Sequence, residues 1–165
     1  MRDVRITGTG QLLNVSRDLR RAGGARLQRN FARRIRRAAE PLRDDLQNAV
    51  RTLPIRGQGG SKRGGPSPTT RPLRATIAAA IRISVRTSAN PGAKVWIDRN
   101  ALPPDMRAMP NKLDEGYWRH PVFGNKRRWV GQYASPWWDV TIRAHTARMT
   151  AEVERVLDDV QRDLS

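Results

Sequence analysis

Two histidines, His120 and His145, are the side chains of this sequence that titrate near neutral pH without a perturbed environment. A hydrolase or nuclease would have to combine His120 with a neighbouring carboxylate, Asp114 or Glu115, to activate water. Nothing in their spacing demands that role, and His145 falls on the apolar stripe of a predicted helix, where a core or interface histidine is expected. The sequence contains no H-E-x-x-H, G-x-S-x-G or P-loop motif. We therefore expect no catalytic residue and no enzyme.

Metal and cofactor sites are equally hard to build from these residues. There is no Cys, and two distant histidines with scattered carboxylates lack the ligand spacing of a metal site. The glycine-rich stretch 57–65 lacks both the preceding strand and the spacing of a P-loop. We expect neither a metal nor a cofactor.

Positive charge dominates the chain, since 32 Lys+Arg face 15 Asp+Glu and give a net charge of +17. All but four of the basic residues are arginines, which bind planar carboxylate and phosphate groups bidentately, although a GC-rich genome would produce the same bias. Two interpretations stay open. The basic clusters either bind nucleic acid, with Trp129 beside Lys126–Arg128 stacking on a base, or form a face that is solvated or meets an acidic protein.

Aromatic residues gather in one segment, because seven of the nine lie between residues 113 and 138. A stretch dense in Trp, Tyr and Arg has the composition of an interface hot spot. The alternative is that these rings seal the core beneath an irregular loop. We expect a mixture, in which Trp129 and Trp138 are buried and the others contact neighbours.

Two long amphipathic helices are predicted to position this segment. Apolar residues from Leu27 to Leu53 recur at spacings of three and four, and Pro41 predicts a kink near Arg37 or two abutting helices. A last helix is predicted from Ser135, as N-cap, to about Leu164, with the exposed side linked by i,i+4 ion pairs. A short strand within 4–13 and a short helix over 14–22 precede them.

The middle of the chain predicts a loop followed by a small sheet. Residues 54–72 are rich in Gly and Pro and carry no acid, which is typical of a long mobile loop. A short helix over 73–80 is followed by two alternating strands, 81–86 and 93–97, which form a hairpin. The chain 1–165 is therefore predicted to be a single α+β domain with a mobile basic loop at 54–72 and an aromatic interface loop at 113–135.

Membrane insertion and secretion are not expected. No window approaches the roughly 18 consecutive apolar residues that span a bilayer, and the first residues lack the apolar stretch of a signal peptide. We expect a soluble protein without a membrane partner.

The aromatic segment also carries a family resemblance. The run from Tyr117 to Asn125, Trp129-Val130 with Gln132, and Pro136-Trp137-Trp138 at the start of the last helix resemble the neck or tail-component proteins of long-tailed bacteriophages, the gene-product-ten-like group. The order of elements is also similar: an arginine-rich long helix, a Gly/Pro-rich loop, a hairpin, an aromatic loop and a final helix.

The resemblance implies a structural virion protein that forms a ring at the head-to-tail junction, joins the capsid connector to the tail and leaves a channel for the genome. It implies a homo-oligomer, connector and tail proteins as partners, and assembly in the host cytoplasm. The expected interface residues are Trp118, Arg119, His120, Phe123, Trp129, Gln132 and Trp137. The basic loop would face the channel, which makes Arg56, Lys62 and Arg63 candidate contacts to DNA. The alternative function is a free basic nucleic-acid-binding protein.

A closed ring needs two different complementary patches on every subunit. We expect the Trp-rich segment and the acidic terminal helix to form one patch. The arginine face of residues 26–43 would form the other. Residues 1–51 carry a net charge of +8 and residues 139–165 a net charge of −2, which is the asymmetry such patches require.

Overall fold

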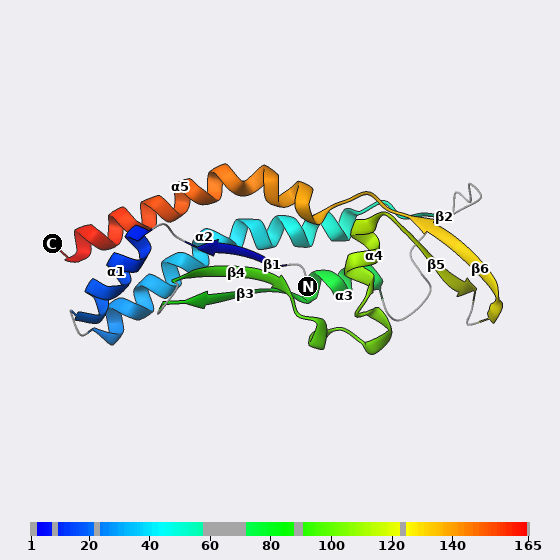
Figure 1. The fold of residues 1–165 in the computed structure, drawn as a ribbon, viewed down its shortest axis with the longest axis horizontal. Helices are drawn as coiled ribbons and strands as arrows, with labels where there is room; N and C mark the ends of the chain where they lie inside the picture. Colours follow the sequence, from blue (N-terminus) through cyan, green and yellow to red (C-terminus); the bar gives the residue numbers. More distant parts are fainter. Residues whose placement is uncertain are drawn as a thin grey trace.

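A computed structural model describes residues 3–7, 10–21, 24–57, 72–87, 91–122 and 125–164. The molecule is elongated and layered (Figure 1). Helix α5 (Trp138–Leu164) lies on α2 (Ala25–Thr52), and α2 in turn lies on a sheet formed by β1 (Asp3–Thr7), β3 (Ile81–Arg86) and β4 (Gly92–Ile97). These elements confirm the predicted α+β class.

Helix α2 is the central element, because it contacts α5, α3 (Leu73–Ala79) and both strands of the β3–β4 hairpin. Its apolar stripe is buried as predicted, with Phe31, Ile35, Leu42 and Leu46 at most 1% exposed. The helix is continuous through Pro41, so the prediction of two abutting helices is wrong. Packing on both sides holds the chain helical across a residue that cannot donate a backbone hydrogen bond. At its carboxyl end, Arg74 Nη1 donates to the Leu53 carbonyl at 2.8 Å.

Helix α5 begins at Trp138, later than the predicted Ser135 cap. The cap comes instead from another helix, α4 (Met109–Glu115). Asp114 is 7% exposed, and its Oδ1 accepts hydrogen bonds from the backbone N–H groups of Trp137 at 2.9 Å and Trp138 at 2.8 Å. This buried carboxylate satisfies two of the free N–H groups at the start of α5. Its negative charge also interacts favourably with the positive end of the helix dipole. Two of the exposed ion pairs differ from those predicted, because Arg155 pairs with Glu152 and Arg162 with Asp159 at i,i+3 instead of with residues at i,i+4.

The first sheet has the order β1-β4-β3 and is antiparallel throughout. The predicted hairpin is confirmed, with Ile81 opposite Ile97 and Val85 opposite Ala93. One face of this hairpin is buried on α2, and the opposite face carries exposed Arg82 and Arg86. The strand predicted within 4–13 ends at Thr7, and α1 (Gly10–Arg21) begins four residues before the expected Asn14. Ser16 Oγ fixes α1 by donating to the Thr87 carbonyl at 2.6 Å.

The second sheet replaces most of the predicted aromatic loop. β5 (Tyr117–Val122) and β6 (Asn125–Tyr133) form an antiparallel hairpin, and β2 (Arg56–Gly57) pairs with the other side of β6. Between α4 and β5 the chain turns at Gly116, which has a φ of 90° and lies so close to the Ala134 carbonyl that a Cβ would approach it to 3.2 Å. The described residues of 113–135 therefore lie mostly in α4, β5 and β6. Of the mobile loop predicted at 54–72, Arg56–Gly57 form β2, and residues 58–71 lie outside the described residues.

Two 3-10 turns, η1 (Arg99–Ala101) and η2 (Pro104–Met106), connect β4 to α4. Asp98 begins the first of them by accepting a hydrogen bond from the Asn100 N–H at 3.1 Å. No helix in the described part of the chain is both long and apolar enough to cross a membrane.

Candidate interaction surface on the second hairpin

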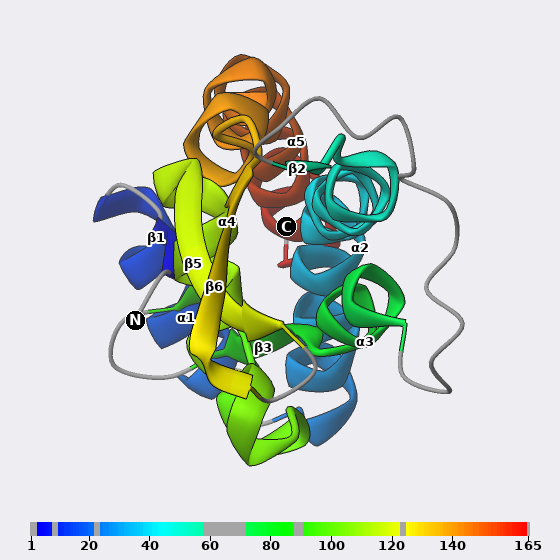
Figure 2. The same cartoon turned by 90° about the vertical axis from the view of Figure 1, so that its right-hand side faces the viewer.

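The β5–β6 hairpin forms one end of the elongated molecule, beyond the region where α2 and α5 pack together (Figures 1 and 2). Because side chains alternate along each strand and residues directly opposite share a face, the register divides the hairpin into two faces. One face is exposed and the other lies towards the protein interior.

The exposed face, called here the outer face, consists of aromatic and arginine side chains. Tyr117 lies opposite Tyr133, and Trp129 lies opposite Pro121 on the same face. The two tyrosine rings are 4.8 Å apart between centroids, and Tyr117, Trp129 and Tyr133 are 41%, 48% and 46% exposed. Arg119 is exposed on this face, and Arg56 of β2 extends it because its partner in the register is Tyr133. The outer face is thus Arg56, Tyr117, Arg119, Trp129 and Tyr133.

The opposite face of the hairpin contributes to the core. Trp118 is only 5% exposed, and His120, Val130 and Gln132 on the same face are half-buried. Trp118 and the core residues Trp137 and Trp138 belong to one continuous apolar cluster. Trp137 and Trp138 meet edge to face with their ring centroids 5.4 Å apart.

The most exposed of the described aromatic side chains, Trp129, is held by a hydrogen bond within its own strand. Trp129 Nε1 donates to the Lys126 carbonyl at 2.8 Å, within its own strand. Its polar atom is therefore satisfied inside the subunit, and the apolar ring is presented to solvent. A large ring that is ordered before binding loses little conformational entropy when it meets a partner. This is the arrangement expected of an interface residue.

Basic side chains lie near the tip of the hairpin. Lys126, Arg127 and Arg128 are all exposed. Asn125 orders the first residues of β6, because its Oδ1 accepts a hydrogen bond from the Arg127 N–H at 3.0 Å. The hairpin therefore joins an aromatic face to a positively charged tip.

A second exposed surface runs along the amino-terminal half of α2, towards the other end of the molecule (Figure 1). It is formed by Arg26, Arg29, Arg33, Arg36 and Arg37, all of them exposed, and we call it the arginine face. Its expected complement, the acidic terminal helix, is partly used within the subunit. Arg34 of α2 donates to Asp163 of α5 at 2.9 Å.

Both histidines have structural partners. His145 lies on α5 with its side chain 12% exposed, and its Nε2 is 2.5 Å from Asp45 Oδ2 on α2. It is an interhelical residue, as the sequence predicts. His120 Nδ1 lies 3.1 Å from the Pro121 carbonyl, whereas the carboxylate of Asp114 binds the start of α5. Within the described residues, no three His, Asp or Glu side chains gather as a metal site requires.

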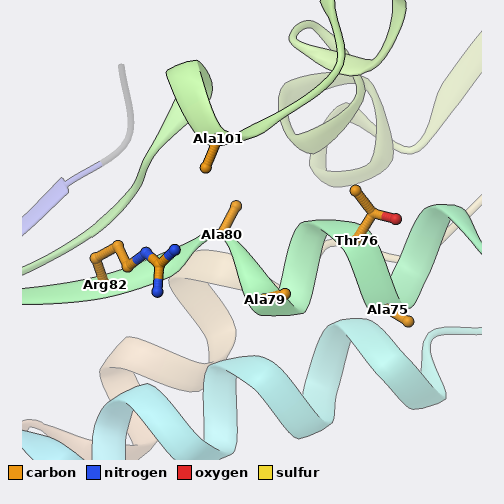
Figure 3. A pocket seen from close by; sticks show the side chains of 6 residues that line it. All are labelled: Ala75, Thr76, Ala79, Ala80, Arg82 and Ala101. Carbon is orange, nitrogen blue, oxygen red and sulfur yellow. The ribbon is translucent and has the colours of Figure 1, made fainter.

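A cavity of about 380 Å³ lies between α3, the start of β3 and η1 (Figure 3). Its walls are mainly small side chains, namely Ala75, Thr76, Ala79, Ala80 and Ala101, with Arg82 at one side. The Thr76 hydroxyl donates to the Pro72 carbonyl at 3.0 Å. This lining brings no acid and base together, so the cavity offers shape and one cation to a ligand.

The structure divides the predicted interface residues. Arg119 and Trp129 lie on the outer face, and His120 and Gln132 are half-buried behind it. Trp118 and Trp137 are core residues, and the prediction that Trp129 is buried is wrong. The reason is strand alternation, which turns Trp118 inward and Trp129 outward. Phe123, Lys62 and Arg63 lie outside the described residues.

Two functional candidates escaped the sequence reading, Tyr117 and Tyr133. The sequence signal that could have found them is the alternation of exposed and buried positions along 117–121 and 129–133. It is obscured because aromatic residues occur on both faces of the hairpin. Arg56, expected in the mobile loop, instead belongs to the same exposed surface. Comparison with protein-family models, curated proteins and solved structures found no match.

Proposed function

We propose that this chain is a structural subunit that assembles through the outer face of its β5–β6 hairpin into a ring. The observation that carries the proposal is the exposed set of three aromatic rings and two arginines at one end of an otherwise well-packed molecule. Aromatic and arginine side chains provide most of the energy at protein interfaces. A fixed, exposed Trp129 is difficult to explain by the stability of the monomer alone.

The position of the second surface favours a head-to-tail arrangement. The outer face and the arginine face lie towards opposite ends of the molecule (Figure 1). Two unlike patches that bind each other form a heterologous contact, which closes into a ring when the rotation allows. Guanidinium groups stack on aromatic rings, so the outer face of one subunit suits the arginine face of the next.

The resemblance to phage neck proteins gives this ring a place. We propose that it lies at the head-to-tail junction of a tailed bacteriophage virion, between the capsid connector and the tail, with a central channel for the genome. Its work is mechanical: it joins two assemblies. Transient contact of the channel wall with DNA is a separate part of this proposal, and it would not involve Arg56, which lies on the outer face.

The test is the native mass of the purified chain, measured over a range of concentrations with and without connector partners. We expect a closed oligomer of defined size, and we expect Trp129→Ala to shift it towards monomer. Because Trp129 is on the surface, the same change should alter the free energy of unfolding by no more than about 0.5 kcal/mol.

Trp118 provides the matched comparison, since it lies on the other face of the same hairpin. Trp118→Ala should destabilise the monomer by about 3–5 kcal/mol because it empties a core position. A chain that remains monomeric with all its partners, or a Trp129→Ala variant that assembles as the parent does, would contradict the proposal.

The second candidate function is a free nucleic-acid-binding protein. The exposed arginine face and the basic tip of the hairpin favour it. It predicts affinity for duplex DNA that falls steeply with salt, because each neutralised phosphate releases counterions. DNA affinity that persists in the monomeric Trp129→Ala variant, in a chain that forms no ring with its partners, would favour this alternative.

A further inference from the structure

A cavity of about 300 Å³ lies in the groove between α2 and α5 and has a strongly basic lining. Arg34 and Arg37 of α2 and Arg148 of α5 reach it, and Glu152 is the one acidic residue on its wall. Pro41 and Val156 form apolar parts of the wall. Since a water occupies about 30 Å³ in the liquid, the cavity has room for a tetrahedral phosphate group together with several waters.

The arginines that line this cavity have hydrogen-bonding capacity that the described residues do not use. Arg34 Nη2 donates to Asp163, but Nη1 of the same group is buried without a hydrogen-bond partner and lies 3.9 Å from Asp159. The guanidinium groups of Arg37 and Arg148 make no ion pair or hydrogen bond with another described residue, unlike those of Arg34 and Arg43. A buried N–H left unpaired costs free energy, and three arginines on the wall of one cavity repel one another unless an anion binds between them.

Glu152 does not neutralise the site. Its Oε1 accepts a hydrogen bond from Arg155 at 2.9 Å, and Arg155 is not part of the lining. The cavity therefore keeps an excess of positive charge, in a groove where Arg34 and Glu152 are only partly exposed.

We propose that this cavity binds one phosphate group, held by the guanidinium groups of Arg34, Arg37 and Arg148. Phosphate offers several acceptor oxygens to planar guanidinium forks, and its charge matches the excess of the lining. The group can come from a free phosphate compound or from the backbone of a nucleic acid. All of these residues lie on the α2–α5 pair of one subunit. Arg37 also belongs to the arginine face, so phosphate binding and a ring built through that face would compete for this residue.

The experiment is a titration of the intact protein with inorganic phosphate at constant ionic strength, followed through the arginine Nε–H resonances. Arg148→Gln should weaken binding by about tenfold, or about 1.4 kcal/mol, because one charge-assisted contact is lost. Arg143→Gln is the matched control, since it removes the same charge from an exposed position of α5 outside the cavity.

A variant of opposite sign guards against a loss that comes from misfolding. Glu152→Gln removes the one acidic side chain of the lining and should strengthen phosphate binding about two- to threefold. Glu154→Gln, exposed on α5 and outside the cavity, should leave the affinity unchanged.

A parallel titration with a short DNA duplex identifies the source of the phosphate. If the site takes backbone phosphate, Arg148→Gln weakens duplex binding more than Arg143→Gln and lowers the salt slope by about one. If it takes a free phosphate compound, only the first titration separates these two variants. The proposal is overturned if Arg148→Gln equals Arg143→Gln in both titrations, or if Glu152→Gln binds no tighter than Glu154→Gln.

Discussion

Asp114 shows how one buried side chain joins distant parts of the fold. It lies on α4, and its carboxylate binds the backbone at the start of α5, more than twenty residues later in the sequence. The same contact fixes the two core tryptophans that follow Pro136. Sequence reading assigned the cap to Ser135 because local signals cannot reveal a capping group that arrives from another element.

Removing this cap should destabilise the protein. We expect Asp114→Ala to lower the free energy of unfolding by about 1–3 kcal/mol, because two backbone N–H groups lose their acceptor in a buried site. Asp114→Asn keeps an acceptor oxygen and should retain most of the stability. Urea unfolding of the two variants checks this, and equal losses for Ala and Asn would contradict a capping role.

Asp3 supplies a prediction about pH. Lys94 Nζ lies 2.8 Å from Asp3 Oδ2, and this hydrogen bond lowers the pKa of the Asp3 carboxyl below its ordinary value, helped by Arg5 at 3.4 Å and opposed by partial burial. A lowered pKa in the folded state means that the contact stabilises the protein above the ordinary pKa and that this stabilisation is lost as pH falls through the lowered value.

A carboxyl NMR titration tests this pair. In Lys94→Gln we expect the pKa of Asp3 to rise towards its ordinary value, with a small loss of stability at neutral pH that disappears in acid, since exposed ion pairs contribute about 0.2–1 kcal/mol. An unchanged pKa of Asp3 would show that Lys94 is not its main partner.

Among the elements, sequence periodicity identified the helices and the first hairpin but missed the second. The stripe from Phe31 to Leu46 predicted α2 because one side of that helix is buried along its length. The strands β5 and β6 escaped because Pro121 interrupts one of them and because apolar rings lie on both faces, which removes the simple alternation of a half-buried strand. The pairing of β2 with β6 depends on a long-range contact that no local pattern encodes.

Pro41 is the residue of α2 that disfavours the helix in which it lies. It cannot donate a backbone hydrogen bond to the Arg37 carbonyl, and proline is about 3 kcal/mol less favourable than alanine inside a helix. We expect Pro41→Ala to raise the free energy of unfolding by about 1–2 kcal/mol, part of the gain being offset by a less restricted unfolded chain.

Chemical denaturation measures this effect. Glu40→Ala, at the preceding position, serves as a control. It should change the free energy of unfolding by less than about 0.5 kcal/mol, because glutamate and alanine are both good helix formers. A lower stability of Pro41→Ala would mean that packing of the proline ring outweighs the lost hydrogen bond.

At the scale of the whole molecule, the sequence predicted an interface segment but not its geometry. Composition alone located the interface candidates between residues 113 and 138. Only the register separates the outer face from the core, and only the fold sets this face and the arginine face towards opposite ends of the molecule (Figure 1). Which tryptophan is exposed, and so available to a neighbour, is decided by strand alternation and tertiary packing, and composition contains neither.

The proposed head-to-tail contact is tested most directly by a photo-crosslinking amino acid, p-benzoylphenylalanine, placed at position 129. We expect irradiation to join two copies of the chain, with the adduct mapped by mass spectrometry to the arginine face of the second copy, around Arg26–Arg33. Adducts between position 129 of both copies would instead indicate a two-fold dimer. That result, or the absence of any intermolecular adduct with the partners present, would contradict a ring built through the outer face.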